Sequence, residues 1–240
     1  MAAKVILGLC TSGSRLKLAA SAGGKVFSAQ KKVFNQELAL FPMARALLAR
    51  AGSDLRSVNT VCSVRGPGRF TGIRISLTLA GALKAMAGAE VYTATLFEIL
   101  ALGAADTPQF RAWAKTTGGT RLAVLVHAFK DEYFCQLFNA GGKLKTPRPE
   151  GEPVWLKSED LRAMLAGLAG PLYAAADAEE DPGIYGLLPA GVPKAPPAVS
   201  KIIPALVIKA CLAYKNRTLR PLYLKPAKYE LENNISYGRK

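Results

Sequence analysis

The sequence predicts an α/β protein with two lobes, each built on a mixed sheet of the ribonuclease-H kind. The chain opens on a meander of apolar strand candidates and continues into strand–helix crossovers, and its second half repeats this order in outline. Half of the 240 residues are apolar, so the chain can bury a core of the size that two lobes need. Together these observations predict the fold class.

In the first half, apolar runs alternate with turn residues in the order of a meander followed by crossovers. The residues from Ser21 to Gly24 are typical of a hairpin turn. Asn35 is the expected N-cap of the first helix, which contains Pro42, and Thr95 is the expected N-cap of the third helix. The expected elements are strands over 4–9, 16–20 and 25–31, a helix over 36–51, a strand over 58–64, a helix over 73–87, a strand over 90–94 and a helix over 95–105.

The second half begins with a strong apolar strand, and its later signals are weaker. An irregular link is expected over 147–153, and Ser200 is the expected cap of the last helix. The expected elements are strands over 121–128 and 133–139, a short extended piece over 154–156, a helix over 158–167, a strand over 171–175, a helix over 202–215 and an extended piece over 221–226. The predicted division is an N-terminal lobe over 1–104, a C-terminal lobe over 105–217, and a C-terminal segment with a basic tail over 218–240.

The helix expected over 73–87 lacks a broad polar face. Its larger apolar side chains, among them Leu77, Leu83 and Met86, point in several directions, and many of its other residues are Ala or Gly. A helix that is apolar nearly all round is either central to its domain or covered by a partner.

The chain is strongly basic, with a formal net charge of +15. Before Glu90 the acidic residues are Glu37 and Asp54 alone, against thirteen Lys and Arg. Such a surface favours a polyanion or an acidic protein as partner. A generally basic surface that serves solubility is the alternative interpretation.

Cysteine and histidine usage excludes several kinds of site. The four cysteines, at 10, 62, 135 and 211, include no C-x-x-C pair, so a zinc knuckle and a redox motif are both excluded. His127 is the single histidine, which excludes a multi-histidine metal site and makes a structural histidine the simpler interpretation. Reduced, buried thiols and the absence of an apolar run of membrane-spanning length predict a cytoplasmic protein without a membrane segment.

A glycine-rich stretch, RGPGRFTGIR at 65–74, joins the strand over 58–64 to the helix over 73–87. A strand, a glycine-rich turn and a helix N-terminus in this order can present backbone N–H groups to an anion. The spacing matches neither a P-loop nor a dinucleotide fingerprint, and a purely structural turn is the alternative. Because Cys10 and not a carboxylate follows the first strand, we expect binding without turnover and no metal. The candidate anion or nucleotide residues are Thr11, Ser12, Arg65, Gly66, Gly68, Arg69, Thr71, Gly72 and Arg74.

Three motifs resemble the TsaB (YeaZ) family: ILGLCTS at 6–12, RGPGRFTGIR at 65–74 and PLYLKP at 221–226. The second matches the family signature RGPGSFTGxR, except that Arg69 replaces serine. Other departures are Cys10 for the usual aspartate, Asn35-Gln36 for His-Ser, and the triplet starting at His127 for Asp-Ala-Arg. Each change removes a polar group from around the expected cleft.

The resemblance implies a two-lobed fold of the actin, sugar kinase and Hsp70 (ASKHA) superfamily. It also implies a non-catalytic subunit that assembles with TsaD, which transfers the threonylcarbamoyl group to an adenosine of tRNA (t6A). A TsaE-like ATPase and tRNA would join the complex. No intrinsic cofactor is expected, although ATP or ADP could bind at the interface of the complex.

Contact with the TsaD-like subunit, or with a second copy of the chain in a homodimer, would run through the helices over 36–51 and 73–87. The expected interface residues are Leu40, Ala44, Leu47, Ser76, Leu79, Ala80, Leu83 and Met86. Two alternatives stay open: a basic RNA-binding module that acts alone, and a small-molecule kinase or ATPase of the ASKHA fold.

Overall fold

The computed structural model describes residues 4–141 and 144–225, and they form two sheets with helices on both sides of each. Sheet A has five strands in the order β3-β2-β1-β4-β5. The first three strands pair antiparallel as a meander, and the last two add in parallel. The strands are β1 (Val5–Cys10), β2 (Arg15–Ala22), β3 (Lys25–Lys32), β4 (Val58–Val64) and β5 (Glu90–Ala94).

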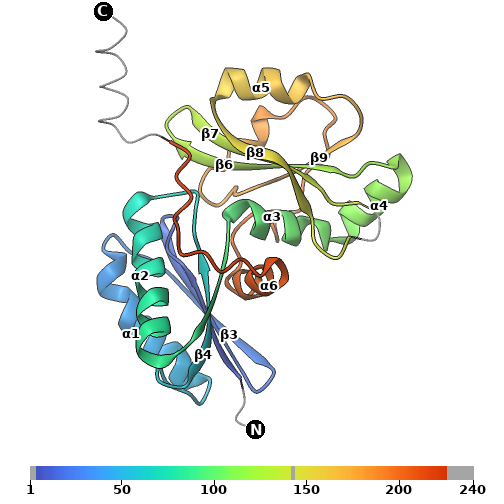
Figure 1. Cartoon of the computed structure of the whole chain (residues 1–240). Helices are drawn as coiled ribbons and strands as arrows, with labels where there is room; N and C mark the ends of the chain where they lie inside the picture. The colour runs from blue at the N-terminus through green and yellow to red at the C-terminus, as the bar shows by residue number, and fades with distance from the viewer. Residues whose placement is uncertain (1–3, 142–143, 226–240) are drawn as a thin grey trace, which may run out of the picture.

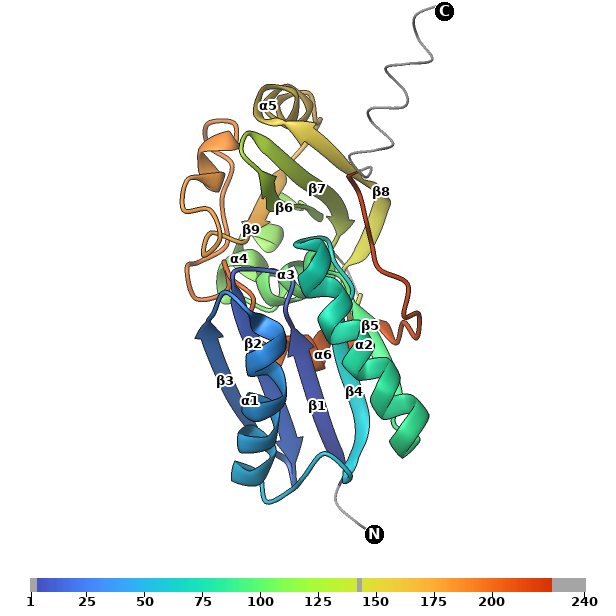
Figure 2. The ribbon, with the colours of Figure 1, turned by 90° about the vertical axis from the view of Figure 1, so that its left-hand side faces the viewer.

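Two helices cover one face of sheet A, α1 (Gln36–Arg50) and α2 (Phe70–Ala87), as Figure 2 shows. Their buried apolar side chains pack against alternate residues of the strands, Leu7 and Val61 among them. The opposite face of sheet A is covered by α6 (Pro204–Tyr214), whose Ile208 packs against the side of the sheet that carries Cys62. The last helix of the described residues therefore completes the sheet that β1 begins.

Sheet B has four strands in the order β8-β7-β6-β9 and repeats the opening of sheet A. Its antiparallel meander is β6 (Arg121–Phe129), β7 (Glu132–Asn139) and β8 (Arg148–Lys157), and β9 (Leu172–Ala176) pairs in parallel with β6. Its outer face is covered by α5 (Ser158–Ala166), and a short 3₁₀ helix, η1 (Ile184–Leu187), packs into the same cluster.

Two further helices pack on the inner face of sheet B, α3 (Leu96–Ala105) and α4 (Pro108–Thr117). In Figure 1, α3 and α6 lie between the two sheets, and one continuous core joins them to residues of both. The predicted fold class, an α/β protein of two lobes that each carry a mixed sheet of the ribonuclease-H kind, is confirmed. Although α6 falls within the range predicted for the C-terminal lobe, it packs on sheet A.

The predictions of individual elements were correct for most helices and strands, but several predicted helix boundaries and caps were wrong. Thr95 caps α3 as predicted, in a capping box with Glu98. Asn35 precedes α1, but its side chain makes no capping hydrogen bond, since its backbone (φ −97°, ψ 85°) is not extended. The Ser200 hydroxyl donates to the carbonyl of Ala195 and does not cap α6, which begins at Pro204.

Three other expectations need correction. The second helix begins at Phe70 and not at Ile73. Thr71 and Gly72, which the glycine-rich composition assigned to the loop, lie in its first turn. From residue 148 onward, the link expected over 147–153 belongs to strand β8, and α4 was not expected. The predicted turn at Gly141-Gly142 and the basic tail beyond residue 225 lie wholly or partly outside the described residues. None of the helices in the described ranges is long and apolar enough to span a membrane.

Candidate functional site

The glycine-rich loop between β4 and α2 wraps tightly around the end of β1. The Arg69 N–H donates to the Ser12 carbonyl at 2.8 Å, and the Thr11 hydroxyl donates to the Gly72 carbonyl at 2.5 Å. A Cβ atom at Gly72 would lie 1.9 Å from the Thr11 carbonyl oxygen, and one at Gly68 would lie 2.5 Å from that of Ser12. These two glycines therefore serve close backbone packing, which is the structural alternative considered from the sequence.

The other side of the loop packs against the C-terminal segment. The Leu222 N–H donates to the Arg65 carbonyl at 2.7 Å, and a Cβ atom at Gly66 would lie 2.6 Å from the Leu222 carbonyl oxygen. The Leu96 N–H donates to the Gly66 carbonyl at 2.8 Å. Much of the loop backbone is thus engaged by the protein itself, and an anion site on this loop stays a prediction.

The three predicted arginines do not converge on one point. The Arg74 guanidinium lies 3.9 Å from the Phe70 ring centroid, and its Nε donates to the Tyr223 hydroxyl at 3.0 Å. Arg65 is half-buried, and its Nε has no hydrogen-bond partner in the described part of the chain. Arg69 is exposed and reaches a pocket between the lobes. Thr71 is also exposed and lines a separate hollow near α1.

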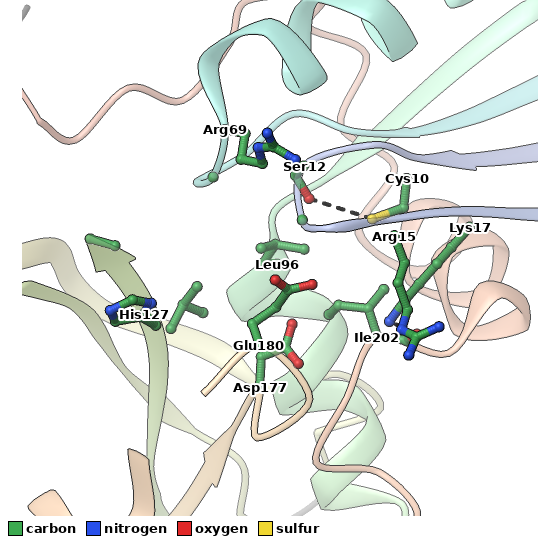
Figure 3. Close-up of a pocket in the computed structure, with 14 residues that line it drawn as sticks. Cys10, Ser12, Arg15, Lys17, Arg69, Leu96, His127, Asp177, Glu180 and Ile202 are labelled. Atoms are coloured by element: carbon green, nitrogen blue, oxygen red, sulfur yellow. Dashed lines mark hydrogen bonds between the residues drawn. The ribbon is translucent and has the colours of Figure 1, made fainter. Parts of the chain in front are cut away.

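The pocket between the two lobes, which we call the interlobe pocket, has a volume of about 150 Å³. Figure 3 shows its charged and polar side chains, which come from distant parts of the chain. One wall is the end of β1 together with the glycine loop, and the other is the end of β6 with the loop after β9. The lining residues are Cys10, Ser12, Gly13, Arg15, Lys17, Gly68, Arg69, Leu96, Val126, His127, Ala128, Asp177, Glu180 and Ile202.

Two carboxylates of the interlobe pocket were missed by sequence reasoning, which expected no acid near the glycine loop. Asp177 is 3% exposed, and within the described residues its Oδ1 has no hydrogen-bond partner. Burial raises the pKa of Asp177 from 3.8 to about 6. Glu180 Oε1 accepts from the backbone N–H and the hydroxyl of Ser14, each at 2.9 Å. An acidic run directly after an apolar strand was the available signal, because such positions gather at one edge of a sheet.

A third carboxylate beside the pocket is already paired. Lys17 is 3% exposed, and its ammonium contacts the Glu179 carboxylate and donates to the Ile202 carbonyl at 2.9 Å. Arg15 Nε lies 3.4 Å from the other Glu179 oxygen. These contacts match Glu179 with two cations and tie β2 to the loop after β9.

In the described part of the chain, neither Cys10 nor His127 is hydrogen-bonded to a side chain that could form a catalytic dyad with it. Burial raises the pKa of the Cys10 thiol, so the thiol stays neutral at physiological pH, and its Sγ lies 3.4 Å from the Ser12 hydroxyl. His127 Nε2 lies 2.9 Å from the Lys130 carbonyl, within the β6–β7 turn. Across the described ranges, no three His, Cys, Asp or Glu side chains are grouped as a metal would require.

On α1 and α2, most of the predicted interface residues are buried by the chain itself. Leu83 is half-buried, and Met86 is 87% exposed. The other six lie in the core: Leu40, Ala44, Leu47, Ser76, Leu79 and Ala80. A partner would therefore meet mainly other side chains of the same helices, although Leu40 and Leu79 contribute to the floor of the surface between them.

Those side chains border a hollow of about 460 Å³ between α1 and α2, which we call the helix groove. Phe41 of α1 and Phe70 of α2 line it and are 50% and 52% exposed, while Leu38 nearby on α1 is 72% exposed. The sequence predicted both helices, but it did not distinguish the residues that pack on sheet A from those exposed to solvent.

The fold and the interlobe pocket define a class: an α/β protein of two lobes, each built on a mixed sheet, with a pocket between them. Within that class, the family model described as TsaD, tRNA N6-adenosine threonylcarbamoyltransferase, matches residues 22–134. The chain is 30% identical over 95 residues to the Escherichia coli (strain K12) tRNA threonylcarbamoyladenosine biosynthesis protein TsaB. That alignment covers 40% of this chain and 37% of the TsaB protein, so the chain spans little more than a third of the curated relative's length.

Two solved structures have the same fold over nearly the whole chain. YeaZ from Pseudomonas aeruginosa is 22% identical with a TM-score of 0.66, and the match covers 92% of this chain and all of that one. An uncharacterized protein, described as similar to peptidase YEAZ from Pseudomonas aeruginosa, matches with the same identity and coverage and a TM-score of 0.62. The predicted resemblance to TsaB and YeaZ is confirmed as a similarity in sequence and in fold.

Proposed function

We propose that this chain is a non-catalytic assembly subunit of a tRNA threonylcarbamoyladenosine transferase complex, in which it holds a TsaD-like catalytic subunit. The similarity to TsaB supports a part in t6A synthesis. The observation that carries the assembly role is the helix groove, an apolar hollow on the surface between α1 and α2, the helix that follows the glycine-rich loop.

The helix groove has the features of a docking surface. Exposed aromatic side chains on neighbouring helices are costly in water, and such contiguous patches mark interaction sites. Phe41 and Phe70 present about half of their surfaces from opposite sides of the hollow. Large aromatic anchors of this kind supply much of the binding free energy at protein interfaces. The exposed Met86, at the far end of α2, extends the apolar surface along that helix.

The chemistry of the interlobe pocket supports a role without turnover. Its thiol is neutral, and its histidine is engaged in a turn. A volume of about 150 Å³ is below the roughly 300 Å³ at which ligand pockets usually begin, which disfavours an ASKHA-type kinase or ATPase. The proposal includes a TsaE-like ATPase and tRNA in the complex, ATP or ADP at its interface, and homodimers through the same groove when the partner is missing. A cytoplasmic location is also proposed, and four free, buried cysteines support it.

Co-expression with the TsaD-like protein of the same organism tests the proposal. We expect a stable complex on gel filtration and t6A nucleoside in a reconstituted reaction that neither protein forms alone. Phe41→Asp should weaken the complex at least tenfold, because it places a charge in a desolvated anchor site. The matched control is Val26→Asp, on β3, which is 53% exposed and does not line the groove. Proteins that migrate separately, or a complex that is indifferent to Phe41→Asp, would contradict the docking role.

A second candidate, an RNA-binding module that acts alone, is favoured by the net charge of +15. It predicts tight tRNA binding by the isolated chain that weakens steeply with salt, with a slope set by the number of phosphates neutralised. Weak binding that appears only when the TsaD-like partner is present would leave the assembly role as the better account.

A further inference from the structure

The interlobe pocket has no part in the proposed docking function, yet it contains an unusual arrangement of charge. Asp177 and Glu180 lie side by side in Figure 3, with Arg15 and Lys17 on one side and His127 on the other. Both carboxylates come from the loop that follows β9, and both line the pocket.

The cations nearest to the two carboxylates are committed elsewhere. Arg15 and Lys17 both pair with Glu179, and Lys17 also donates to a backbone carbonyl. Across residues 4–141 and 144–225, neither Asp177 nor Glu180 forms an ion pair. The Lys17 charge still acts on Asp177 and opposes the rise in its pKa. Apart from Arg69, two cations thus face three carboxylates in and beside the pocket, namely Asp177, Glu179 and Glu180.

Asp177 carries the strongest sign of a missing partner. In the described chain its Oδ1 is buried and has no hydrogen-bond partner. A buried acceptor without a donor costs about 1–3 kcal/mol, and more when it is charged. Native proteins rarely keep such a group unless a ligand, an ion or water satisfies it.

We propose that the interlobe pocket binds a small primary amine, whose ammonium group donates to Asp177 Oδ1 and to Glu180. An ammonium group has three donors and one positive charge, which fits two adjacent carboxylates. The remaining wall is apolar, with Leu96, Val126 and Ile202, and suits a short alkyl chain. An engineered cavity of about 150 Å³ holds benzene, so a molecule of a few carbon atoms fits this volume.

The same charges disfavour the anion that the glycine loop first indicated. A phosphate group here would face Asp177 and Glu180 at close range, and like charges repel strongly in a site of low dielectric. Arg69 is the cation at the open rim, across the pocket from the two carboxylates. Of the three cations that line the pocket, Arg15 and Lys17 are paired with Glu179, and Arg69 has no ion pair within the described residues. A second, anionic group on the ligand would therefore meet Arg69, and that residue distinguishes an α-amino acid from a simple alkylamine.

Isothermal titration and ligand-observed NMR on the full chain test this site, with propylammonium, L-alanine and inorganic phosphate as probes. We expect propylammonium to bind and phosphate not to bind. Asp177→Asn should weaken amine binding at least tenfold, since it removes the charge that faces the ammonium group. Glu180→Gln should weaken it less, and Asp160→Asn, an exposed residue of α5, should leave it unchanged.

Arg69→Gln separates the two ligand classes, because it should lower the affinity for L-alanine and spare propylammonium. Circular dichroism of each variant establishes that it is folded. If no amine binds at about 10 mM, or if folded Asp177→Asn binds amines as well as the parent chain does, the proposal is wrong. Phosphate binding that is lost in Arg69→Gln and kept in Asp177→Asn would also overturn it. None of these outcomes depends on whether a TsaD-like subunit binds the helix groove.

Discussion

Asp177→Asn should change how the stability of this protein depends on pH. The Asp177 carboxyl is 3% exposed, and burial raises its pKa from 3.8 to about 6. The folded state therefore holds this proton more tightly than the unfolded state does. Asparagine has nearly the same shape and stays neutral at every pH, so the variant removes the titration and keeps most of the packing.

The sign and size of the effect follow from linkage between protonation and folding. Because the folded-state pKa is the higher one, stability is greatest when the carboxyl is protonated and falls as pH rises from about 4 to about 6. A rise in pKa from 3.8 to about 6 corresponds to about 3 kcal/mol of lost stability above that window. The advantage of Asp177→Asn over the parent chain should therefore grow by about 3 kcal/mol between acid and neutral pH.

Urea unfolding followed by circular dichroism, at several values between about pH 4 and about pH 7, measures this difference. Other carboxyls titrate in the same range, but they do so in both proteins and cancel in the comparison. Asp160→Asn, on the exposed side of α5, is the matched control and should show no comparable trend. A stability difference that is flat with pH, or that shrinks as pH rises, would refute the assignment of Asp177 as a buried, unpaired carboxyl.

Two further substitutions test the local structure. Gly72→Ala should destabilise the protein by about 2–4 kcal/mol in thermal unfolding, because its Cβ would lie 1.9 Å from the Thr11 carbonyl oxygen. Gly186→Ala is the control: its Cβ would have no neighbour within 4 Å, so its stability in the same assay should be nearly unchanged. Thr95→Ala should lower the free energy of unfolding by about 1–2 kcal/mol, since it removes the α3 cap. An equal loss of stability in Thr116→Ala, whose exposed hydroxyl donates to the Ala112 carbonyl within α4, would argue against a capping effect.

The sequence allowed correct predictions where a few neighbouring residues decide the structure. Thr95 was predicted to cap α3 and does so, and the structure adds that Glu98, three residues further on, completes a capping box. The Pro- and Gly-containing stretch of β8 was taken for a link, yet β8 is the edge strand of sheet B, where proline is tolerated because one side of the strand needs no donors. Local composition does not reveal an edge position, since that depends on the pairing of the whole sheet.

The candidate sites show the same limit. The glycine loop was found from its motif, but Asp177 and Glu180 reach the pocket from more than one hundred residues further along the chain. Their approach depends on how the two sheets are placed around α3 and α6, which no spacing rule encodes. Likewise, Leu40 and Phe41 are neighbours in one apolar helix, and only packing against sheet A decides that Leu40 is buried and Phe41 exposed.

The position of α6 has a consequence for synthesis on the ribosome. Sheet A is built from strands that end at Ala94, but the helix that covers its inner face begins at Pro204. At about 5–20 residues per second, roughly five to twenty seconds separate the emergence of β5 from that of α6. Throughout this interval the apolar face around Cys62 has no covering helix, so the nascent first lobe exposes that face to solvent until α6 has been made.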